Sequence, residues 1–382
     1  MSGSSFTKGL TQAEVERYSR QLVLPELGPK GQQKLKGSSA LIVGAGGLGI
    51  PASVYLAAAG VGRLGVVDDD VVEKSNLHRQ TIYSEEDVGR AKARVAGERL
   101  HSVNPHVTIE PQEVRLTSTN AMGLLKAYDV VIDCTDNFPA RYLINDACVL
   151  LGKPDVYASI FRFDGQASVF YAKTGPCYRC LFPEPPPSDS VQDCAVAGVL
   201  GVLPGIMGSI QAVEALKLML GQGEPLGGRL LLFNAMDMSF NELRYKKNEG
   251  CPVCGKTPTI KSLIDYEAFC GWRAPPAVRE IGPVELKRLM DQKAKVTILD
   301  VREPFEHDLC SIRGSKLIPL GELPGRIGEL DRAADTVVYC HLGVRSARAV
   351  ELLASEGFSR VRNLKGGIRS WAEEVDASMP IY

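Results

Sequence analysis

SALIVGAGGLG, residues 39–49, is a short apolar run that ends in a loop with four glycines. The alanine-rich residues 50–59 that follow are typical of a helix, so the stretch predicts a strand, a tight turn and a helix. Glycines in such a turn let the backbone approach phosphates, and the helix N-terminus offers unpaired N–H groups. The stretch therefore predicts a nucleotide-phosphate site, with these binding residues: Gly44, Gly46, Gly47 and Gly49.

Further apolar strands are expected at residues 64–68 and 129–133, each ending in acidic residues. Strands that alternate with helices imply a mostly parallel sheet, so the fold class is α/β with a Rossmann-like first domain. Strand-like pieces continue to residue 234, periodicity then fades, and a new α/β pattern begins. We expect a nucleotide-binding domain over residues 11–255, a linker over 256–278 and a smaller α/β domain over 279–382.

Charge and length narrow the class of protein. The chain has 382 residues, enough for about two or three domains. Its 44 Lys and Arg nearly balance 45 Asp and Glu, which argues against nucleic-acid binding and favours small-molecule or protein partners.

The N-terminus does not resemble a secretory signal, so a cytoplasmic location is expected. Residues 194–213 carry no charge over the length of a membrane span, but their glycines and Pro204 favour a loop entering a buried helix.

The residues around the glycine loop bear on which nucleotide it binds. Asp68 follows the second strand, where its carboxylate could accept hydrogen bonds from a ribose. Taken alone, this pattern favours NAD, but a glycine loop cannot distinguish NAD from ATP, because both carry adenosine ribose and phosphate. Arg79 and Lys92 could bring positive charge to phosphates, and Asp136 could hold Mg²⁺, which favours ATP. Both cations could instead belong to a solvated face, and an NAD-dependent oxidoreductase remains the alternative, although no hydride-transfer site is located.

Two CxxC pairs stand among the ten cysteines of the chain. Four thiolates can hold Zn²⁺ in a closed tetrahedral site, which would be structural. The pairs would instead be redox-active thiols if they lay far apart in space. The predicted zinc ligands are Cys177, Cys180, Cys251 and Cys254.

The segment Cys340-His341-Leu342-Gly343-Val344-Arg345-Ser346 follows an apolar strand and opens a helix. This arrangement turns backbone N–H groups and the helix dipole toward the Cys340 sulfur and stabilises a thiolate. Protein phosphatases and rhodaneses share this geometry, but phosphatases usually have five residues between cysteine and arginine, whereas this loop has four. The smaller loop favours a persulfide, with Cys340 and Arg345 as catalytic residues.

The first domain resembles the MoeB and ThiF family, relatives of ubiquitin-activating enzymes. The resemblance rests on RYSRQ (17–21), the glycine loop, DDD (68–70), SNLHRQ (75–80), GRAK (89–92), NPH (104–106) and DCTDN (133–137). It implies ATP- and Mg²⁺-dependent adenylation of the C-terminal glycine of a small ubiquitin-like sulfur carrier that ends in Gly-Gly. It also implies a homodimer and the same zinc-binding cysteines. The roles that it implies are ribose binding by Asp68, phosphate binding by Arg79 and Lys92 with Asn76 nearby, magnesium binding by Asp136, phosphate contact by Arg20 of a neighbouring subunit, and thioester or disulfide chemistry at Cys194.

The second domain resembles rhodaneses through DVR (300–302), RGS (313–315), IP (318–319) and GGIRSW (366–371). Together the two domains resemble sulfur-carrier activating proteins of the MoeZ, MoeBR or molybdopterin synthase sulfurylase type. This resemblance implies adenylation of the carrier followed by sulfur transfer from a Cys340 persulfide, which yields a thiocarboxylate. The sulfur donor is open between thiosulfate and a cysteine desulfurase, and molybdenum cofactor biosynthesis is one of several compatible pathways. The alternative is an adenylating enzyme whose rhodanese domain only binds partners.

Overall fold

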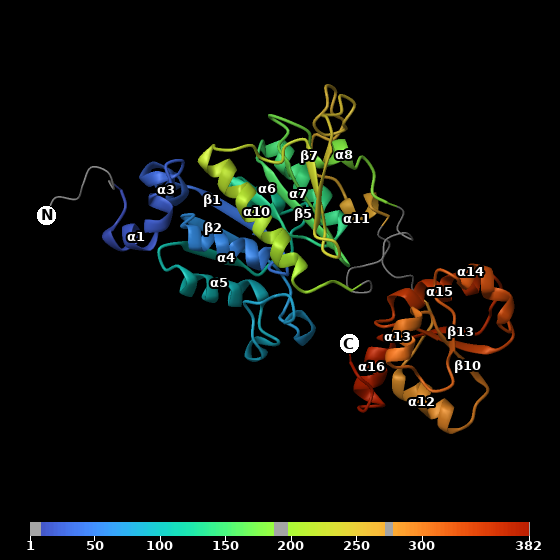
Figure 1. Cartoon of the computed structure of the whole chain (residues 1–382). Coiled ribbons are helices and arrows are strands. Elements are labelled where there is room, and N and C mark those ends of the chain that lie inside the picture. Colours follow the sequence, from blue (N-terminus) through green and yellow to red (C-terminus); the bar gives the residue numbers. More distant parts are fainter. Residues whose placement is uncertain (1–8, 187–197, 272–277, 382) are drawn as a thin grey trace. The chain divides into compact units, whose positions relative to one another are not determined.

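The computed structural model describes residues 9–186, 198–271 and 278–381. The chain forms two compact units, Met1–Trp272 and Arg273–Tyr382 (Figure 1). Each unit is built around its own sheet, as the alternating strand and helix patterns predict.

The first unit contains an eight-stranded sheet in the order β3-β2-β1-β4-β5-β6-β7-β8. Strands β1 to β5 are parallel, and β6 to β8 extend the sheet as antiparallel strands. From β1 the chain adds β2 and then β3 on one side, and it then crosses back to add β4 on the other side of β1. The order of the strands therefore reverses between β1 and β4. Ligands of such sheets bind at the carboxyl ends of the strands at this point. The strands are β1 (Ser39–Val43), β2 (Arg63–Val67), β3 (Thr108–Gln112), β4 (Val130–Asp133), β5 (Asp155–Phe161), β6 (Asp164–Phe170), β7 (Arg229–Asn234) and β8 (Ser239–Arg244).

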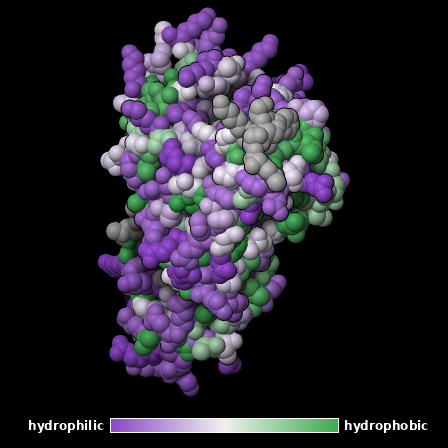
Figure 2. Space-filling view, turned by 90° about the vertical axis from the view of Figure 1, so that its left-hand side faces the viewer, coloured by the Kyte–Doolittle hydropathy of each residue, from purple (hydrophilic) through white to green (hydrophobic). Residues whose placement is uncertain are grey.

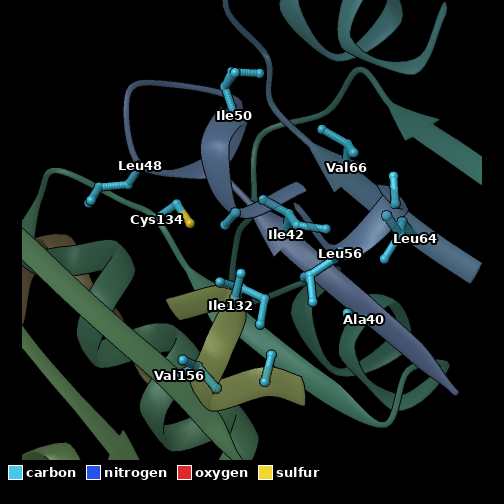
Figure 3. Close-up of a cluster of buried hydrophobic side chains, with 14 of the residues drawn as sticks. Ala40, Ile42, Leu48, Ile50, Leu56, Leu64, Val66, Ile132, Cys134 and Val156 are labelled. Carbon is cyan, nitrogen blue, oxygen red and sulfur yellow. The ribbon is translucent and has the colours of Figure 1, made fainter. Parts of the chain in front are cut away.

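Helices cover both faces of this sheet. Alternate residues of β1 point to opposite faces. Ala40 and Ile42 lie in the buried cluster with α4 (Gly49–Ala59), α5 (Lys92–Val103) and α10 (Leu203–Leu220) (Figure 3). Leu41 and Val43 lie in the cluster with α6 (Ala121–Lys126) and α7 (Phe138–Leu151). Buried on both faces, β1 is apolar along its whole length. The helices of this unit are α1 (Gln12–Arg17), α2 (Ser19–Leu22), α3 (Gly28–Gly37), α4 (Gly49–Ala59), α5 (Lys92–Val103), α6 (Ala121–Lys126), α7 (Phe138–Leu151), α8 (Tyr178–Leu181), α10 (Leu203–Leu220) and α11 (Tyr266–Phe269).

Helix α10 accounts for most of the uncharged stretch. By length and composition it could cross a membrane, but an apolar helix in a protein core passes the same test. Leu203, Met207 and Ala215 of α10 are buried in the cluster that also holds α4, as expected for a core helix. Figure 2 shows hydrophilic residues over most of one face of the molecule, interrupted by hydrophobic groups.

The expected linker begins inside packed structure. Tyr266 and Cys270 are buried in the core cluster of α7, and the Tyr266 hydroxyl donates a hydrogen bond to Asp146 at 2.9 Å. Residues 256–271 therefore belong to the first unit, and their apolar side chains explain why. The pattern of prolines and fading periodicity did not reveal this docking.

The second unit contains a five-stranded parallel sheet in the order β11-β10-β12-β13-β9. Its strands are β9 (Glu280–Ile281), β10 (Val296–Asp300), β11 (Lys316–Leu317), β12 (Asp335–Tyr339) and β13 (Val361–Leu364). Two buried clusters, one on each face, pack the sheet against its helices. The helices are α12 (Pro283–Asp291), α13 (Pro304–Leu309), α14 (Leu323–Arg326), α15 (Val344–Ser355) and α16 (Gly367–Glu374).

Candidate functional sites

The glycine loop connects β1 to α4 at the switch point of the first sheet. Gly44 has φ +101°, and a β-carbon on it would lie 2.8 Å from the Cys134 carbonyl oxygen. A β-carbon on Gly49 would lie 1.8 Å from the Gly44 carbonyl oxygen. Only glycine therefore fits at these two positions, and the tight turn brings the N-terminus of α4 to the carboxyl edge of the sheet.

Asp68 joins the glycine loop to the end of β2. Its carboxylate accepts hydrogen bonds from the Ala45 N–H at 2.7 Å and the Asp70 N–H at 2.8 Å. Burial raises the pKa of Asp68, and the charge of Lys92 offsets part of this rise. Lys92 is itself buried and pairs with Asp70 at 3.0 Å. The structure thus places Asp68 and Lys92 beside the loop.

Arg79 borders the loop on its other side. Its Cγ lies 3.6 Å from the position of a β-carbon on Gly47. The guanidinium donates to the Ser75 carbonyl at 2.9 Å and lies 2.8 Å from His78 Nε2. Burial and the neighbouring Arg79 charge lower the pKa of His78. Asn76 is buried one turn earlier and accepts the Glu73 N–H at 3.3 Å, so in this structure it fixes the backbone that presents Arg79.

Asp136 follows β4 across the switch point from the glycine loop. It is exposed, and Asn137 donates a hydrogen bond to it at 3.4 Å. Asn137 also caps α7 by accepting the Ala140 N–H at 3.0 Å. The turn is held by Thr135, which donates from both its N–H and its hydroxyl to buried Asp133. An exposed carboxylate on a fixed turn at this edge is suited to bind a cation.

Arg20 does not join this group within one chain. Helix α2 is anchored at the far end of α4, where Gln21 donates to the Ala59 carbonyl at 3.2 Å and Tyr18 packs on Gly60. Helix α4 has 11 residues, so about 16 Å of helix separates this anchor from the glycine loop. Arg20 is exposed at this distant end.

The four cysteines of the CxxC pairs converge. Their sulfur atoms all lie within 4.8 Å of one another, with contacts of 3.9 Å for Cys177–Cys180, 3.6 Å for Cys177–Cys251 and 3.4 Å for Cys180–Cys254. Four sulfurs about 2.3 Å from a tetrahedral Zn²⁺ would be separated by about 3.8 Å. The donor set therefore fits zinc. The redox alternative required the two CxxC pairs to lie far apart, and they lie together.

The two residues between Cys177 and Cys180 bind this site to α7. Arg179 is fully buried and donates to both carboxylate oxygens of Asp146 at 2.8 Å. Tyr266 donates to the same carboxylate, and the Tyr178 N–H donates to Asn145 at 2.8 Å. The cysteine site, α7 and the docked segment 256–271 thus form one packed assembly, which sequence patterns did not predict.

Cys340 lies at the carboxyl end of β12, and its side chain is only 1% exposed. Its sulfur accepts the Gly343 N–H at 3.2 Å and the Ser346 hydroxyl at 3.3 Å. Helix α15 begins at Val344, so its N-terminus faces the sulfur as predicted. Gly367 of α16 closes the loop from behind, because a β-carbon there would lie 2.3 Å from the His341 carbonyl oxygen.

Arg345 has a partner that sequence reasoning missed. Its two terminal nitrogens donate to the two carboxylate oxygens of Glu306, both at 2.7 Å, and the Glu306 side chain is 3% exposed. Arg302 donates to the Glu306 carbonyl at 3.1 Å and pairs with buried Asp300. Glu306 stands near the DVR motif, but no spacing rule connects it to a loop 39 residues later. Cys194 lies outside the described residues.

The two units thus define a protein class: an α/β domain with a glycine loop at the switch point of its sheet and a four-thiol site, followed by a domain with a cysteine held in a backbone loop. Two known families match the chain, one over each unit. The ThiF family matches residues 18–253 and the rhodanese-like domain matches residues 282–374. This chain belongs to the ThiF family and carries a C-terminal rhodanese-like domain.

Three relatives illustrate the range of similarity. A sulfur carrier protein adenylyltransferase of Thermus thermophilus is 58% identical over 69% of this chain and 99% of its own length. A probable adenylyltransferase/sulfurtransferase MoeZ of Mycobacterium tuberculosis is 45% identical over 98% of this chain and 96% of its own. The adenylyltransferase and sulfurtransferase MOCS3 of Sus scrofa is 44% identical over 98% of this chain and 89% of its own.

Solved structures support the fold of the first unit. Escherichia coli MccB with ATP aligns with a TM-score of 0.56 and 22% identity, covering 65% of this chain and 76% of MccB. PaaA aligns with a TM-score of 0.56 and 24% identity, covering 65% of this chain and 78% of PaaA.

Proposed function

We propose that this chain adenylates the C-terminal glycine of a small ubiquitin-like sulfur carrier with ATP and then converts the activated carboxyl group to a thiocarboxylate with sulfur from Cys340. The observation that carries the proposal is that one chain holds both a glycine loop at the carboxyl edge of its first sheet and a buried cysteine in a backbone loop of its second unit. Relatives whose names include both activities align along nearly the whole chain, which supports carrying both over.

In the first step the carrier carboxylate attacks the α-phosphorus of ATP, and pyrophosphate leaves. We assign the ribose to Asp68, the triphosphate to the four loop glycines with Arg79 and Lys92, and Mg²⁺ to Asp136. Supporting this, Asp68 and Lys92 flank the loop on the β2 side, and Arg79 lies 3.6 Å from the position of a Gly47 β-carbon. The cations would stabilise negative charge on the departing pyrophosphate. Asn76 acts by fixing the turn that carries Arg79.

In the second step a persulfide on Cys340 attacks the activated carbonyl carbon, and AMP leaves. The product joins the carrier to Cys340 through an acyl disulfide. A second thiol must then attack the Cys340 sulfur of that disulfide, which releases the thiocarboxylate and leaves Cys340 disulfide-bonded until an external thiol reduces it. We propose Cys194 as that thiol. The hydrogen bonds from Gly343 and Ser346 would stabilise the Cys340 thiolate, which supports catalysis over a purely partner-binding role.

The four-cysteine site would hold a structural Zn²⁺. Because all four positions would be filled by sulfur, the ion would take no part in either reaction. Its ligands would join residues 177–180 to residues 251–254 at the edge of the first unit.

We further propose that the chain works as a homodimer, in which Arg20 of one subunit contacts phosphates bound to the other. Support comes from the position of α2, which is hydrogen-bonded to the C-terminal end of α4. The length of α4, about 16 Å, separates this point from the glycine loop of the same chain. Exposed apolar residues nearby, Val23 and Leu24, are also suited to an interface.

Pyrophosphate exchange tests the adenylation step. Wild type should exchange labelled pyrophosphate into ATP only when a small protein ending in Gly-Gly is present. Asp136→Asn should lower exchange at least about tenfold. The exposed carboxylate Glu86 provides the control, because Glu86→Gln should leave exchange unchanged. Absence of exchange with every Gly-Gly protein tried would exclude the proposed adenylation.

A cyanide assay tests the sulfur step separately. Wild type loaded with sulfur should release thiocyanate, and Cys340→Ala should not. Thiocyanate release by Cys340→Ala would move the sulfur acceptor to another residue.

A further inference from the structure

The rim of the Cys340 loop is apolar. Leu342 is 48% exposed and Val344 is 45% exposed, whereas Cys340 is buried. Arg345 is the only lysine or arginine in the segment 340–346. Within this segment, a ligand that approaches the sulfur can contact the exposed aliphatic side chains of Leu342 and Val344, and Arg345 is the only lysine or arginine that the segment offers it.

That guanidinium is already neutralised. Glu306 takes both terminal nitrogens of Arg345, and the carboxylate is buried. Helix α13 fixes Glu306 in turn, since the Glu303 N–H donates to Glu306 Oε2 at 3.0 Å in a capping box. An anion that recruited Arg345 would leave the Glu306 carboxylate buried without its bidentate partner, which is unfavourable.

Small anionic donors therefore fit this loop poorly. Thiosulfate carries two negative charges and must shed water to bring its outer sulfur to a buried thiolate, so it needs cations at the mouth. A persulfide on a peptide cysteine carries at most one charge, and its surrounding side chains can pack on Leu342 and Val344.

We propose that Glu306 is a specificity-determining residue: by holding Arg345 it disfavours small sulfur-bearing anions and leaves an apolar rim for a persulfide borne on a protein or peptide. This inference rests on the proposed sulfur-transfer function. In the reaction the Cys340 thiolate attacks the outer sulfur of the donor persulfide. The new bond joins Cys340 Sγ to that sulfur, the donor S–S bond breaks, and its electron pair leaves on the donor thiolate, so no other oxidant or reductant is needed.

The test compares two donors on the full-length protein: sodium thiosulfate, and a persulfidated peptide of zero net charge with apolar residues beside its cysteine. Loading is followed as the mass gain of one sulfur on Cys340. Wild type should load from the peptide about a hundredfold faster than from thiosulfate at equal concentration. Equal or faster loading from thiosulfate would overturn the inference while leaving the sulfur-transfer function intact.

Two gain-of-function variants sharpen the comparison. Glu306→Gln removes the charge that neutralises Arg345 and should raise the rate constant with thiosulfate at least about tenfold. Leu342→Arg adds a cation at an exposed position, where folding is not at risk, and should do the same in a salt-dependent manner. Leu342→Gln, its uncharged control, should not.

The inference fails if a folded Glu306→Gln leaves thiosulfate loading unchanged, or if Leu342→Arg and Leu342→Gln behave alike. If neither donor loads Cys340 in wild type, the sulfur-transfer function itself is excluded, and the inference with it.

Discussion

Single buried carboxyl groups set part of the stability of the first unit. Asp155 begins β5 with its side chain 1% exposed, and its Oδ1 accepts no hydrogen bond from the described residues. Burial, and then the charge of Asp133, raise the pKa of Asp155 well above its usual range. The folded protein therefore keeps this group protonated at pH values where the unfolded chain has released the proton.

Because Asp155 stays protonated in the folded state, the free energy of unfolding depends on pH. Between the pKa of Asp155 in the unfolded chain and its raised pKa in the folded chain, the native state holds one more proton than the unfolded state, so stability falls as pH rises through this window, by up to about 1.4 kcal/mol per pH unit. Asp155→Asn cannot ionise and should be more stable than wild type at pH 7.5, with the advantage shrinking toward pH 4. Urea unfolding at several pH values measures this difference. A constant difference across the range would show that Asp155 does not carry the effect.

Residues in contiguous motifs can be singled out from the sequence, whereas their distant partners cannot. The glycine loop, the CxxC pairs and the Cys340 segment each declare their chemistry within a few positions. Glu306 reaches Arg345, and Tyr266 reaches Asp146 across 120 residues, only because the fold brings them together. No local pattern encodes such pairs.

At the scale of elements, the four cysteines bring residues 177–180 and residues 251–254 together. Cys254→Ala should reduce bound zinc below one ion per chain and lower the free energy of unfolding by at least about 3 kcal/mol, a fraction of the roughly 10–16 kcal/mol seen for zinc in small domains. Metal analysis and thermal unfolding measure both effects. Cys310→Ser, outside the site, is the control and should retain zinc. Full zinc content in Cys254→Ala would exclude Cys254 as a ligand.

The turn into α16 positions the Cys340 loop. Gly367 has φ +65°. A β-carbon at this position would lie 2.5 Å from the Cys340 carbonyl oxygen and 2.3 Å from the His341 carbonyl oxygen, so only glycine leaves room for them. Gly367→Ala should push the loop away from its geometry and lower thiocyanate formation about a hundredfold, because displacements near 1 Å have such effects. Pyrophosphate exchange, which belongs to the other unit, should not change.

Gly321 gives the matched control for this prediction. A β-carbon there meets nothing within 4 Å, so Gly321→Ala should retain thiocyanate formation. Equal loss in both variants would indicate general destabilisation of the second unit instead of a displaced loop.

At the scale of the whole molecule, each unit has its own sheet and its own core, which is why the α/β class and the two-part organisation could be predicted from the sequence. The boundary was harder to predict, because the docking of residues 256–271 depends on tertiary contacts with α7. Sequence also cannot show which residues cooperate between subunits, since a motif does not say in which chain its ligand lies. The proposed role of Arg20 is of this kind.

Mixed dimers test whether Arg20 acts between subunits. Arg20→Ala and Asp136→Asn should each abolish most carrier-dependent pyrophosphate exchange when expressed alone. When the two variants are co-expressed, half of the dimers should contain both, and each of these has one site with an intact Asp136 and an intact Arg20 from the partner. Exchange should then recover to about a quarter of the wild-type level. If Arg20 serves the site of its own chain, every site in every dimer lacks one of the two residues, and co-expression should restore nothing.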